Sequence, residues 1–148
     1  MESDFVSPYS QQSRLAAYRS VSAQGAVADA DPHALVLTVM DATLARLATA
    51  RACIEHKEIR RKAGLLHSSV ILIAELRGSL DLKNGGQLAQ NLSDLYEYMT
   101  RRLIHANLND DVAAVGEVAS LLGEVREAWA AMPPQVRQAP QRPATSAA

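Results

Sequence analysis

The sequence predicts an all-α protein, an antiparallel four-helix bundle with a short N-terminal helical flap and a disordered C-terminal tail. Composition is the first reason: alanine and leucine are abundant, while aromatic residues make up only 4% of the 148 residues. Such a composition favours helices over strands. Periodicity is the second reason, because four segments of about 20 residues repeat apolar positions at spacings of three and four. The connections between them are short, as in antiparallel bundles.

The bundle domain is expected to occupy residues 31–132. Residues 133–148 carry four of the six prolines and no aromatic residue, a composition typical of disordered tails. The opposite end of the chain is polar and rich in small residues, and we expect residues 1–30 to be a flexible segment.

A short helical pattern lies within this N-terminal segment. Leu15, Tyr18 and Val21 recur at a spacing of three. A helix this short is unstable by itself in water. We therefore interpret these three residues as a flap that docks on another surface.

The first helix of the bundle is expected to start at Asp31, which suits the N-cap, and Pro32, which suits the first turn. Its apolar face is formed by Val36, Met40, Leu44, Leu47 and Ile54, and is widened by Leu37 and Thr43.

The second helix has no clear beginning. No Gly or Pro separates it from the first helix, and the charged run EHKEIRRK (55–62) is the one hint of a turn. The sequence by itself therefore permits a single long helix here. The apolar face of the second helix comprises Leu65, Leu66, Ser69, Leu72, Ile73, Leu76 and Leu80. Asn84, Gly85 and Gly86 are expected to stop it.

The third helix is expected from about Gln87 to Ala106, with an apolar face formed by Leu88, Leu92, Leu95, Met99 and Leu103. With Leu95 at 0° and about 100° per residue, the centre of this face lies near 40°. Tyr96 falls at about 100°, on the edge of the core, and Ile104 at about 180°, where it should be exposed.

The fourth helix is expected to begin at Asp110 or Asp111, which suit capping rather than acid–base chemistry. Its face alternates spacings of three and four, through Val115, Val118, Leu122, Val125, Trp129 and Met132. Pro133 and Pro134 end it.

A second tyrosine in the third helix does not fit the core face. Tyr98 falls at about −60°, beside Asn91 and Arg102. Tyrosine and arginine are enriched at protein interfaces, so one interpretation is a partner-binding flank. The other is that Tyr98 packs against a neighbouring helix with its hydroxyl in water.

Charge, cysteine content and hydropathy limit the function classes. The net charge of −1 and the pI of about 6.4 give no basic footprint for nucleic acid or anionic membranes. Cys53 is the one cysteine, so a reducing compartment is expected. The N-terminus does not match a secretory signal, and no apolar run reaches the ~18 residues of a membrane helix. We therefore expect a soluble, cytoplasmic protein.

The residues give no basis for catalysis, a cofactor or a metal site. None of the four histidines follows a Glu by three residues, and no zinc motif is present. Asn84-Gly85-Gly86 lacks the spacing of a phosphate loop. A phosphotransfer bundle would use His67, but no lysine follows it, and Cys53 is best interpreted as a small hydrophobic residue.

The second half of the chain resembles the flagellar export chaperones of the FliS type. The family pattern is matched by Glu75-Leu76, Ser79-Leu80-Asp81, Gly85-Gly86, Ala89, Asn91-Leu92, Leu95-Tyr96, Tyr98-Met99, Arg102-Leu103, Ala106-Asn107 and Trp129. The resemblance covers about residues 14 to 132. The first helix matches more loosely, because Met40 replaces the family's Tyr and Ala42 its Gly.

The resemblance implies an antiparallel bundle with a turn near residue 58 and no catalysed reaction. It implies a cytosolic chaperone that binds the C-terminal segment of flagellin, prevents premature polymerisation and delivers it to the export gate, itself a potential partner. Nucleic acid, membrane insertion and small-molecule substrates are not expected. Candidate partner-binding residues are Asn91, Leu95, Tyr98, Arg102, Asn107, Leu37 and Asp41, with the flap of Leu15, Tyr18 and Val21 covering a groove. An adaptor for another secretion or regulatory partner is the alternative.

Overall fold

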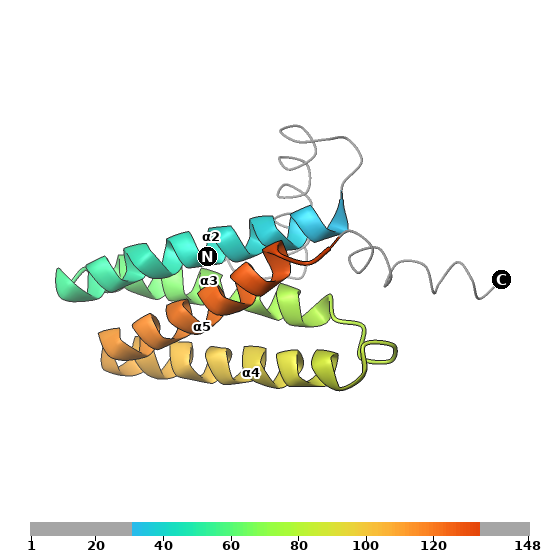
Figure 1. Cartoon of the computed structure of the whole chain (residues 1–148). Coiled ribbons are helices and arrows are strands. Elements are labelled where there is room, and N and C mark those ends of the chain that lie inside the picture. The colour runs from blue at the N-terminus through green and yellow to red at the C-terminus, as the bar shows by residue number, and fades with distance from the viewer. Residues whose placement is uncertain (1–30, 134–148) are drawn as a thin grey trace, which may run out of the picture. The chain divides into compact units, whose positions relative to one another are not determined.

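The structure, a computed structural model, describes residues 31–133, and these form four α-helices without a strand. The helices are α2 (Pro32–Glu55), α3 (Ile59–Gly78), α4 (Gly86–Asn109) and α5 (Val112–Ala130) (Figure 1). The predicted all-α four-helix class is confirmed. The predicted flap and tail lie outside the described residues.

The chain divides into two units, residues 1–38 and residues 39–148. In the first unit, Asp31 caps α2 as predicted. Its Oδ1 accepts a hydrogen bond from the backbone N–H of His33 at 3.0 Å, and its carbonyl accepts one from the N–H of Leu35 at 2.9 Å. The helix packing described below concerns the second unit, from Val39 onward.

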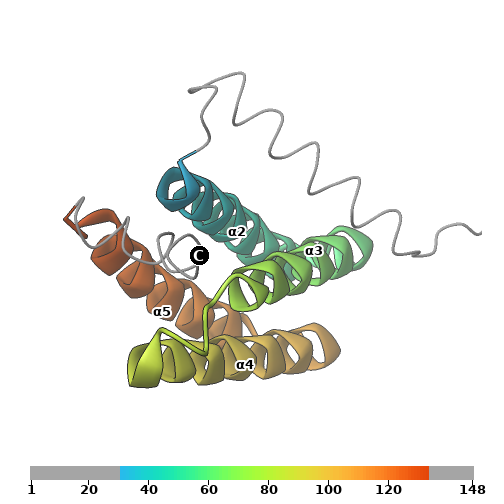
Figure 2. The same cartoon turned by 90° about the vertical axis from the view of Figure 1, so that its right-hand side faces the viewer.

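Helices α3 and α4 run in opposite directions, as contacts between their ends show. Lys62 near the start of α3 bonds to Asn107 near the end of α4, whereas Arg77 near the end of α3 bonds to Ser93 near the start of α4. Seen nearly end-on, α3 and α5 each lie between α2 and α4 (Figure 2). The arrangement is the antiparallel bundle that the periodicity predicts.

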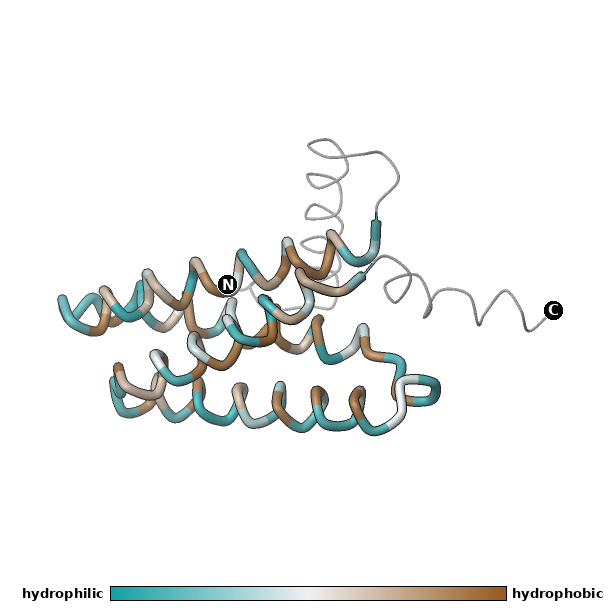
Figure 3. The backbone as a smooth tube through the Cα atoms, in the orientation of Figure 1, coloured by the Kyte–Doolittle hydropathy of each residue, from teal (hydrophilic) through white to brown (hydrophobic). Residues whose placement is uncertain are grey.

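The core is formed by one face of each helix, and hydrophobic and hydrophilic positions alternate along all four (Figure 3). Its largest fully buried side chains are Met40, Leu47, Leu66, Ile73, Met99, Leu103, Val115, Val118 and Leu122, all predicted core residues. Two buried hydroxyls bond to the preceding turn of their own helix: Thr43 to the carbonyl of Val39 at 2.8 Å and Ser69 to that of Leu65 at 2.9 Å. Each hydroxyl therefore has a hydrogen-bond partner although it is buried away from water.

The turn between α2 and α3 is made without glycine or proline. Lys57 adopts a left-handed conformation with φ of 59°. The N–H of Glu58 reaches back to the carbonyl of Cys53 at 2.8 Å, and that of Lys57 to Ile54 at 3.1 Å. This pair of bonds is a Schellman motif, which usually has glycine where Lys57 stands. The alternative of one long helix is therefore wrong, and the turn near residue 58 is confirmed.

The connection between α3 and α4 differs from the prediction. Helix α3 ends at Gly78, so Leu80 lies outside the helix, and the Asn-Gly-Gly run does not stop α3 but leads into α4. The side chain of Asp81 organises the loop by accepting hydrogen bonds from the N–H of Asn84 at 3.0 Å and from its Nδ2 at 2.9 Å. A Cβ at Gly85 would lie 2.5 Å from the Cβ of Ala89, so glycine is needed there for close approach.

A buried lysine joins α3 to the end of α4. Lys62 is only 4% exposed. Its Nζ donates to the backbone carbonyl of Asn107 at 2.8 Å and to Oδ1 of Asp110 at 2.6 Å. Asp110 is itself left-handed, with φ of 51°. A cation at a helix C-terminus satisfies carbonyls that have no partner inside the helix, so Lys62 fixes the α4–α5 turn against α3.

Candidate functional site

The buried face of α4 is rotated from its predicted position. Its buried residues are Ala89, Ser93, Tyr96, Met99, Leu103 and Ala106. Relative to Leu95 these span about 20° to 160°, with a centre near 90° rather than 40°. The small side chains of Ala89, Ser93 and Ala106 let α4 turn this side toward the core. Arg77 of α3 donates a 2.8 Å hydrogen bond to Ser93 on this side.

Part of the predicted core of α4 is not buried. Leu88 is 63% exposed, so its assignment to the core is wrong, and Leu92 and Leu95 are half-buried. These three leucines form an apolar surface on α4, which we call the α4 stripe. The sequence pattern missed the rotation because it gives weight to large apolar residues, whereas alanine and serine are also buried here.

Periodicity predicted that Tyr96 lies on the edge of the core, but the structure places it within the core. Its side chain is buried, and this burial raises its pKa to about 12. The loss of water disfavours the charged phenolate. Tyr96 therefore serves packing.

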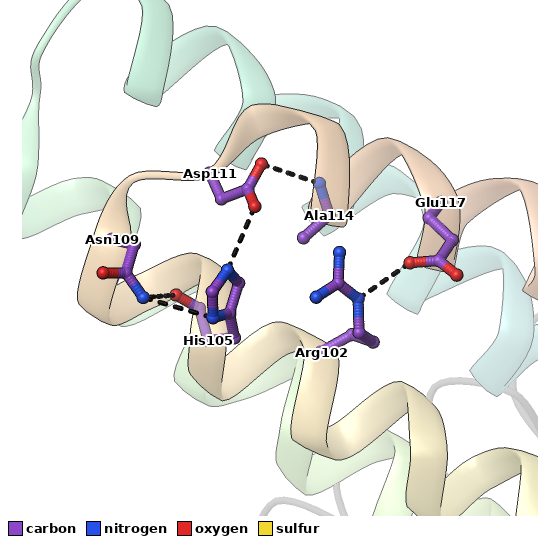
Figure 4. A network of polar contacts seen from close by, with 6 residues as sticks. All are labelled: Arg102, His105, Asn109, Asp111, Ala114 and Glu117. Atoms are coloured by element: carbon purple, nitrogen blue, oxygen red, sulfur yellow. Dashed lines mark hydrogen bonds and ion pairs between the residues drawn. The ribbon is translucent and has the colours of Figure 1, made fainter.

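Tyr98 is held to α5 by a side chain that the sequence analysis did not single out. Its hydroxyl donates a hydrogen bond to Oε2 of Glu117 at 2.5 Å. The other carboxylate oxygen of Glu117 accepts from Nε of Arg102 at 2.8 Å (Figure 4). Tyr98, Arg102 and Glu117 thus form a polar clamp between α4 and α5. Tyr98 does pack against a neighbouring helix, as one interpretation expected, but its hydroxyl bonds to Glu117, whereas that interpretation left it in water.

The pKa values of the clamp follow from these bonds. The hydrogen bond to Glu117 raises the pKa of Tyr98, and the bond from Tyr98, followed by that from Arg102, lowers the pKa of Glu117. The pKa of Arg102 is raised, mainly by its bond to Glu117. A register argument could have found Glu117, because Arg102 and Glu117 lie at similar distances on either side of the Asp110 turn and face each other in an antiparallel pair.

The α4–α5 turn carries a second polar network (Figure 4). Asp111 caps α5 as predicted, with Oδ1 accepting from the N–H of Ala114 at 3.2 Å. Its other oxygen lies 3.1 Å from Nε2 of His105, and Asn109 bonds to the carbonyl of His105 at 3.1 Å. The pKa of Asp111 is lowered, first by the Ala114 N–H.

The remaining candidates on α4 lie on different sides of the helix. Asn91 is exposed and accepts a hydrogen bond from Gln87 at 2.9 Å. Asn91, Tyr98 and Arg102 flank the α4 stripe, to which Leu95 belongs. Asn107 lies about 120° from Leu95, on the side toward α3, and is not brought to the stripe.

Of the two candidates on α2, Asp41 contacts α5. Asp41 pairs with Arg126 of α5, whose Nε lies 2.8 Å from Oδ1 of Asp41. This bond raises the pKa of Arg126. Leu37 belongs to the N-terminal unit and is partly exposed.

The flap residues Leu15, Tyr18 and Val21 lie outside the described residues, and their docking stays a prediction. Among residues 31–133 no three His, Cys, Asp or Glu side chains are grouped to hold a metal ion. None of the helices in this part of the chain is both long and apolar enough to span a membrane. Cys53 is buried, with its Sγ 3.8 Å from a carboxylate oxygen of Glu58.

The described residues define the class of the protein as an all-α helical bundle, with an apolar stripe on α4 that is exposed at Leu88 and half-buried at Leu92 and Leu95. Within this class, the chain belongs to the FliS family, because the family model described as "Flagellar protein FliS" matches residues 14–136.

Similar proteins from several bacteria extend this result. The chain is 43% identical to the flagellar secretion chaperone FliSB of Pseudomonas aeruginosa over 112 residues, which are 76% of this chain and 89% of that protein. It is 39% identical to the flagellar secretion chaperone FliS of Salmonella typhimurium over 124 residues, which are 83% of this chain and 92% of that protein. It is 37% identical to the flagellar secretion chaperone FliS of Escherichia coli over 114 residues, which are 76% of this chain and 84% of that protein.

Proposed function

We propose that this protein is a cytoplasmic chaperone that binds the C-terminal segment of flagellin, prevents its premature polymerisation and delivers it for flagellar export. The proposal assigns no reaction to the chain. Family membership and the relatives' description as flagellar secretion chaperones support the export role. The observation that carries the binding step is the α4 stripe.

The stripe has the properties of a surface for an apolar client. Leu88, Leu92 and Leu95 recur at spacings of four and three along one side of α4, and Leu88 is mostly exposed. Large apolar groups at such spacing receive the apolar face of a helix or an extended segment. A client that is unfolded before binding can order itself on such a surface, with burial of apolar area offsetting the entropy cost.

Polar residues beside the stripe are proposed to orient the client. Asn91, Tyr98 and Arg102 border the three leucines, and the clamp to Glu117 fixes two of them in place. A pre-positioned side chain loses less entropy when a partner binds. Leu37, Asp41 and Asn107 remain proposed contacts of the client.

Calorimetric titration with a peptide covering the last ~40 residues of flagellin from the same organism tests the proposal. We expect one-to-one binding with a negative heat-capacity change. Leu88→Glu should weaken it at least tenfold, because a charge would be buried. The matched control is Leu108→Glu, an exposed leucine on the other side of α4, which should leave affinity unchanged.

Two outcomes contradict the proposal. Absence of binding to the wild-type protein, with the bundle shown to be folded by circular dichroism, would favour an adaptor for a different partner. Equal loss of affinity in Leu88→Glu and Leu108→Glu would remove the stripe as the client surface.

A further inference from the structure

A second group of exposed apolar side chains lies at the end of the bundle that carries the α2–α3 and α4–α5 turns. Ile59 at the start of α3 is 51% exposed, and Ile104 and Leu108 near the end of α4 are 50% and 78% exposed. Burying such side chains is favourable, and nothing in the proposed function uses them. We call these three residues the outer seam.

The three side chains share the side on which α3 and α4 meet. On α4, Ile104 and Leu108 fall at about 180° and 220° from Leu95 around the helix axis. Glu97 falls between them, at about 200°. Glu97 forms an ion pair with Arg77 of α3 at 3.6 Å.

Ile59 lies on the corresponding side of α3. Ile59 lies about five helical turns before Arg77, so both side chains leave α3 in the same direction, toward α4. The bonds of Lys62 to Asn107 and Asp110 hold the two helix ends together beside Ile59. The outer seam is therefore one surface on two fixed helices.

This surface is separate from the α4 stripe. The centre of the stripe and that of the Ile104–Leu108 pair lie about 170° apart around the helix. One helical segment cannot cover both sides of α4, so a ligand on the outer seam leaves the stripe free for the flagellin segment.

Basic side chains outnumber carboxylates around the outer seam. Glu58, which precedes Ile59, pairs with Arg61 at 3.6 Å, and Asp110 pairs with Lys62 at 2.6 Å. Arg60 follows Ile59 and has no ion pair within the described residues, while Arg77 and Arg101 share the single carboxylate of Glu97, at 3.6 and 3.4 Å. A second copy of the chain would bring two such positive rims together. An acidic partner would instead add attraction to apolar burial.

We propose that the outer seam is a docking surface for an acidic amphipathic helix of a partner protein, bound at the same time as the flagellin client. Ile104 and Leu108 are one helical turn apart, which suits a ligand helix with apolar residues at spacings of three and four. Arg60 and Arg101 would then face its acidic residues.

The probe is a synthetic amphipathic peptide of about 20 residues, with leucines along one helical face and glutamates on the other. We expect it to bind the full-length wild-type protein in a calorimetric titration, with and without saturating flagellin peptide. The variant Ile104→Glu/Leu108→Glu should bind it at least tenfold more weakly. Leu88→Glu, on the stripe, is the matched control and should bind it normally.

A charge reversal tests the choice of partner. Arg60→Glu/Arg101→Glu should lose the acidic peptide and gain binding to a counterpart in which lysines replace the glutamates. Both exchanged residues are exposed, and circular dichroism checks that each variant is folded.

Three results would overturn the proposal: no binding of the acidic peptide, equal binding of both peptides by the wild-type protein, or competition with the flagellin peptide. Dimerisation that Leu108→Glu abolishes, seen by sedimentation, would assign the outer seam to a second copy instead. Failure of flagellin binding alone, with acidic-peptide binding intact, would reject the proposed function and simultaneous binding with it, and would leave the outer seam as a docking surface for an acidic helix.

Discussion

Tyr98 of α4 donates its hydroxyl hydrogen bond to Glu117 of α5 at 2.5 Å. Tyr96, only two residues away, is buried in the core. Because positions two apart on a helix point about 200° apart, one tyrosine fills the bundle while the other joins two helices from outside. The pair of tyrosines thus contributes to packing and to the α4–α5 clamp.

Removal of the Glu117 carboxylate, to which Tyr98 and Arg102 both bond, should loosen the clamp. Glu117→Ala is expected to lower the thermal midpoint by a few degrees, because Tyr98 and Arg102 lose their common acceptor. Glu124→Ala, an exposed glutamate on the same helix, is the control and should have little effect. In a Tyr98→Phe background the effect of Glu117→Ala should shrink, since the two residues interact; strictly additive effects would contradict the clamp.

The clamp should also depend on pH. The pKa of Glu117 in the folded protein lies below its usual 4.5 because of the bonds from Tyr98 and Arg102. A group with a lowered pKa stabilises the folded state above its unfolded pKa, and this contribution is lost as pH falls through the folded pKa. The stability difference between wild type and Glu117→Gln, measured by urea unfolding, should be constant near neutrality and shrink below pH 4.5. A difference that grows on acidification would contradict this assignment.

Lys57→Gly should stabilise the protein. Lys57 is held at φ of 59°, which costs a non-glycine residue about 1 kcal/mol relative to glycine. Denaturant unfolding should show a gain of up to about 1 kcal/mol. Lys83→Gly is the matched control, since Lys83 is an exposed loop lysine without positive φ; an equal gain there would remove backbone strain as the cause.

Lys62→Ala should be strongly destabilising. The substitution removes a buried stem and leaves the carbonyl of Asn107 and the carboxylate of Asp110 without their donor. We expect a loss of about 2 to 3 kcal/mol in the free energy of unfolding. Lys62→Met should recover part of it by refilling the space, and Lys83→Ala should be near neutral. A near-neutral Lys62→Ala would mean that Lys62 does not fix the turn.

Two glycines should respond to alanine in opposite ways. Gly64 lies in α3 with open space around the added Cβ, so Gly64→Ala should raise stability by about 1 kcal/mol. At Gly85 the Cβ would meet the carbonyl of Asp81 at 2.6 Å, and Gly85→Ala should lower stability by about 1 to 3 kcal/mol. Thermal unfolding of both variants measures the contrast, and changes of the same sign would contradict it.

Much of the bundle could be predicted because its signals are local. The caps at Asp31 and Asp111 depend on side chains that bond to the next turn, and the heptad-like face of α5 places Val115, Val118 and Leu122 in the core. The break between α2 and α3 could not be predicted from composition. A lysine occupies the left-handed position at the end of α2, where glycine is usual and would have indicated the turn. The resemblance to a family supplied that turn.

The sequence by itself determined the helical class, the core faces of α3 and α5, part of the core face of α2, and a flank of α4 carrying Tyr98 and Arg102, because periodicity and capping act within one helix. Only the tertiary structure decided the rotation of α4, the exposure of Leu88 and the pairing of Tyr98 with Glu117. These depend on how closely small side chains such as Ser93 let a neighbouring helix approach. That distance is a property of two helices packed together, and neither helix specifies it alone.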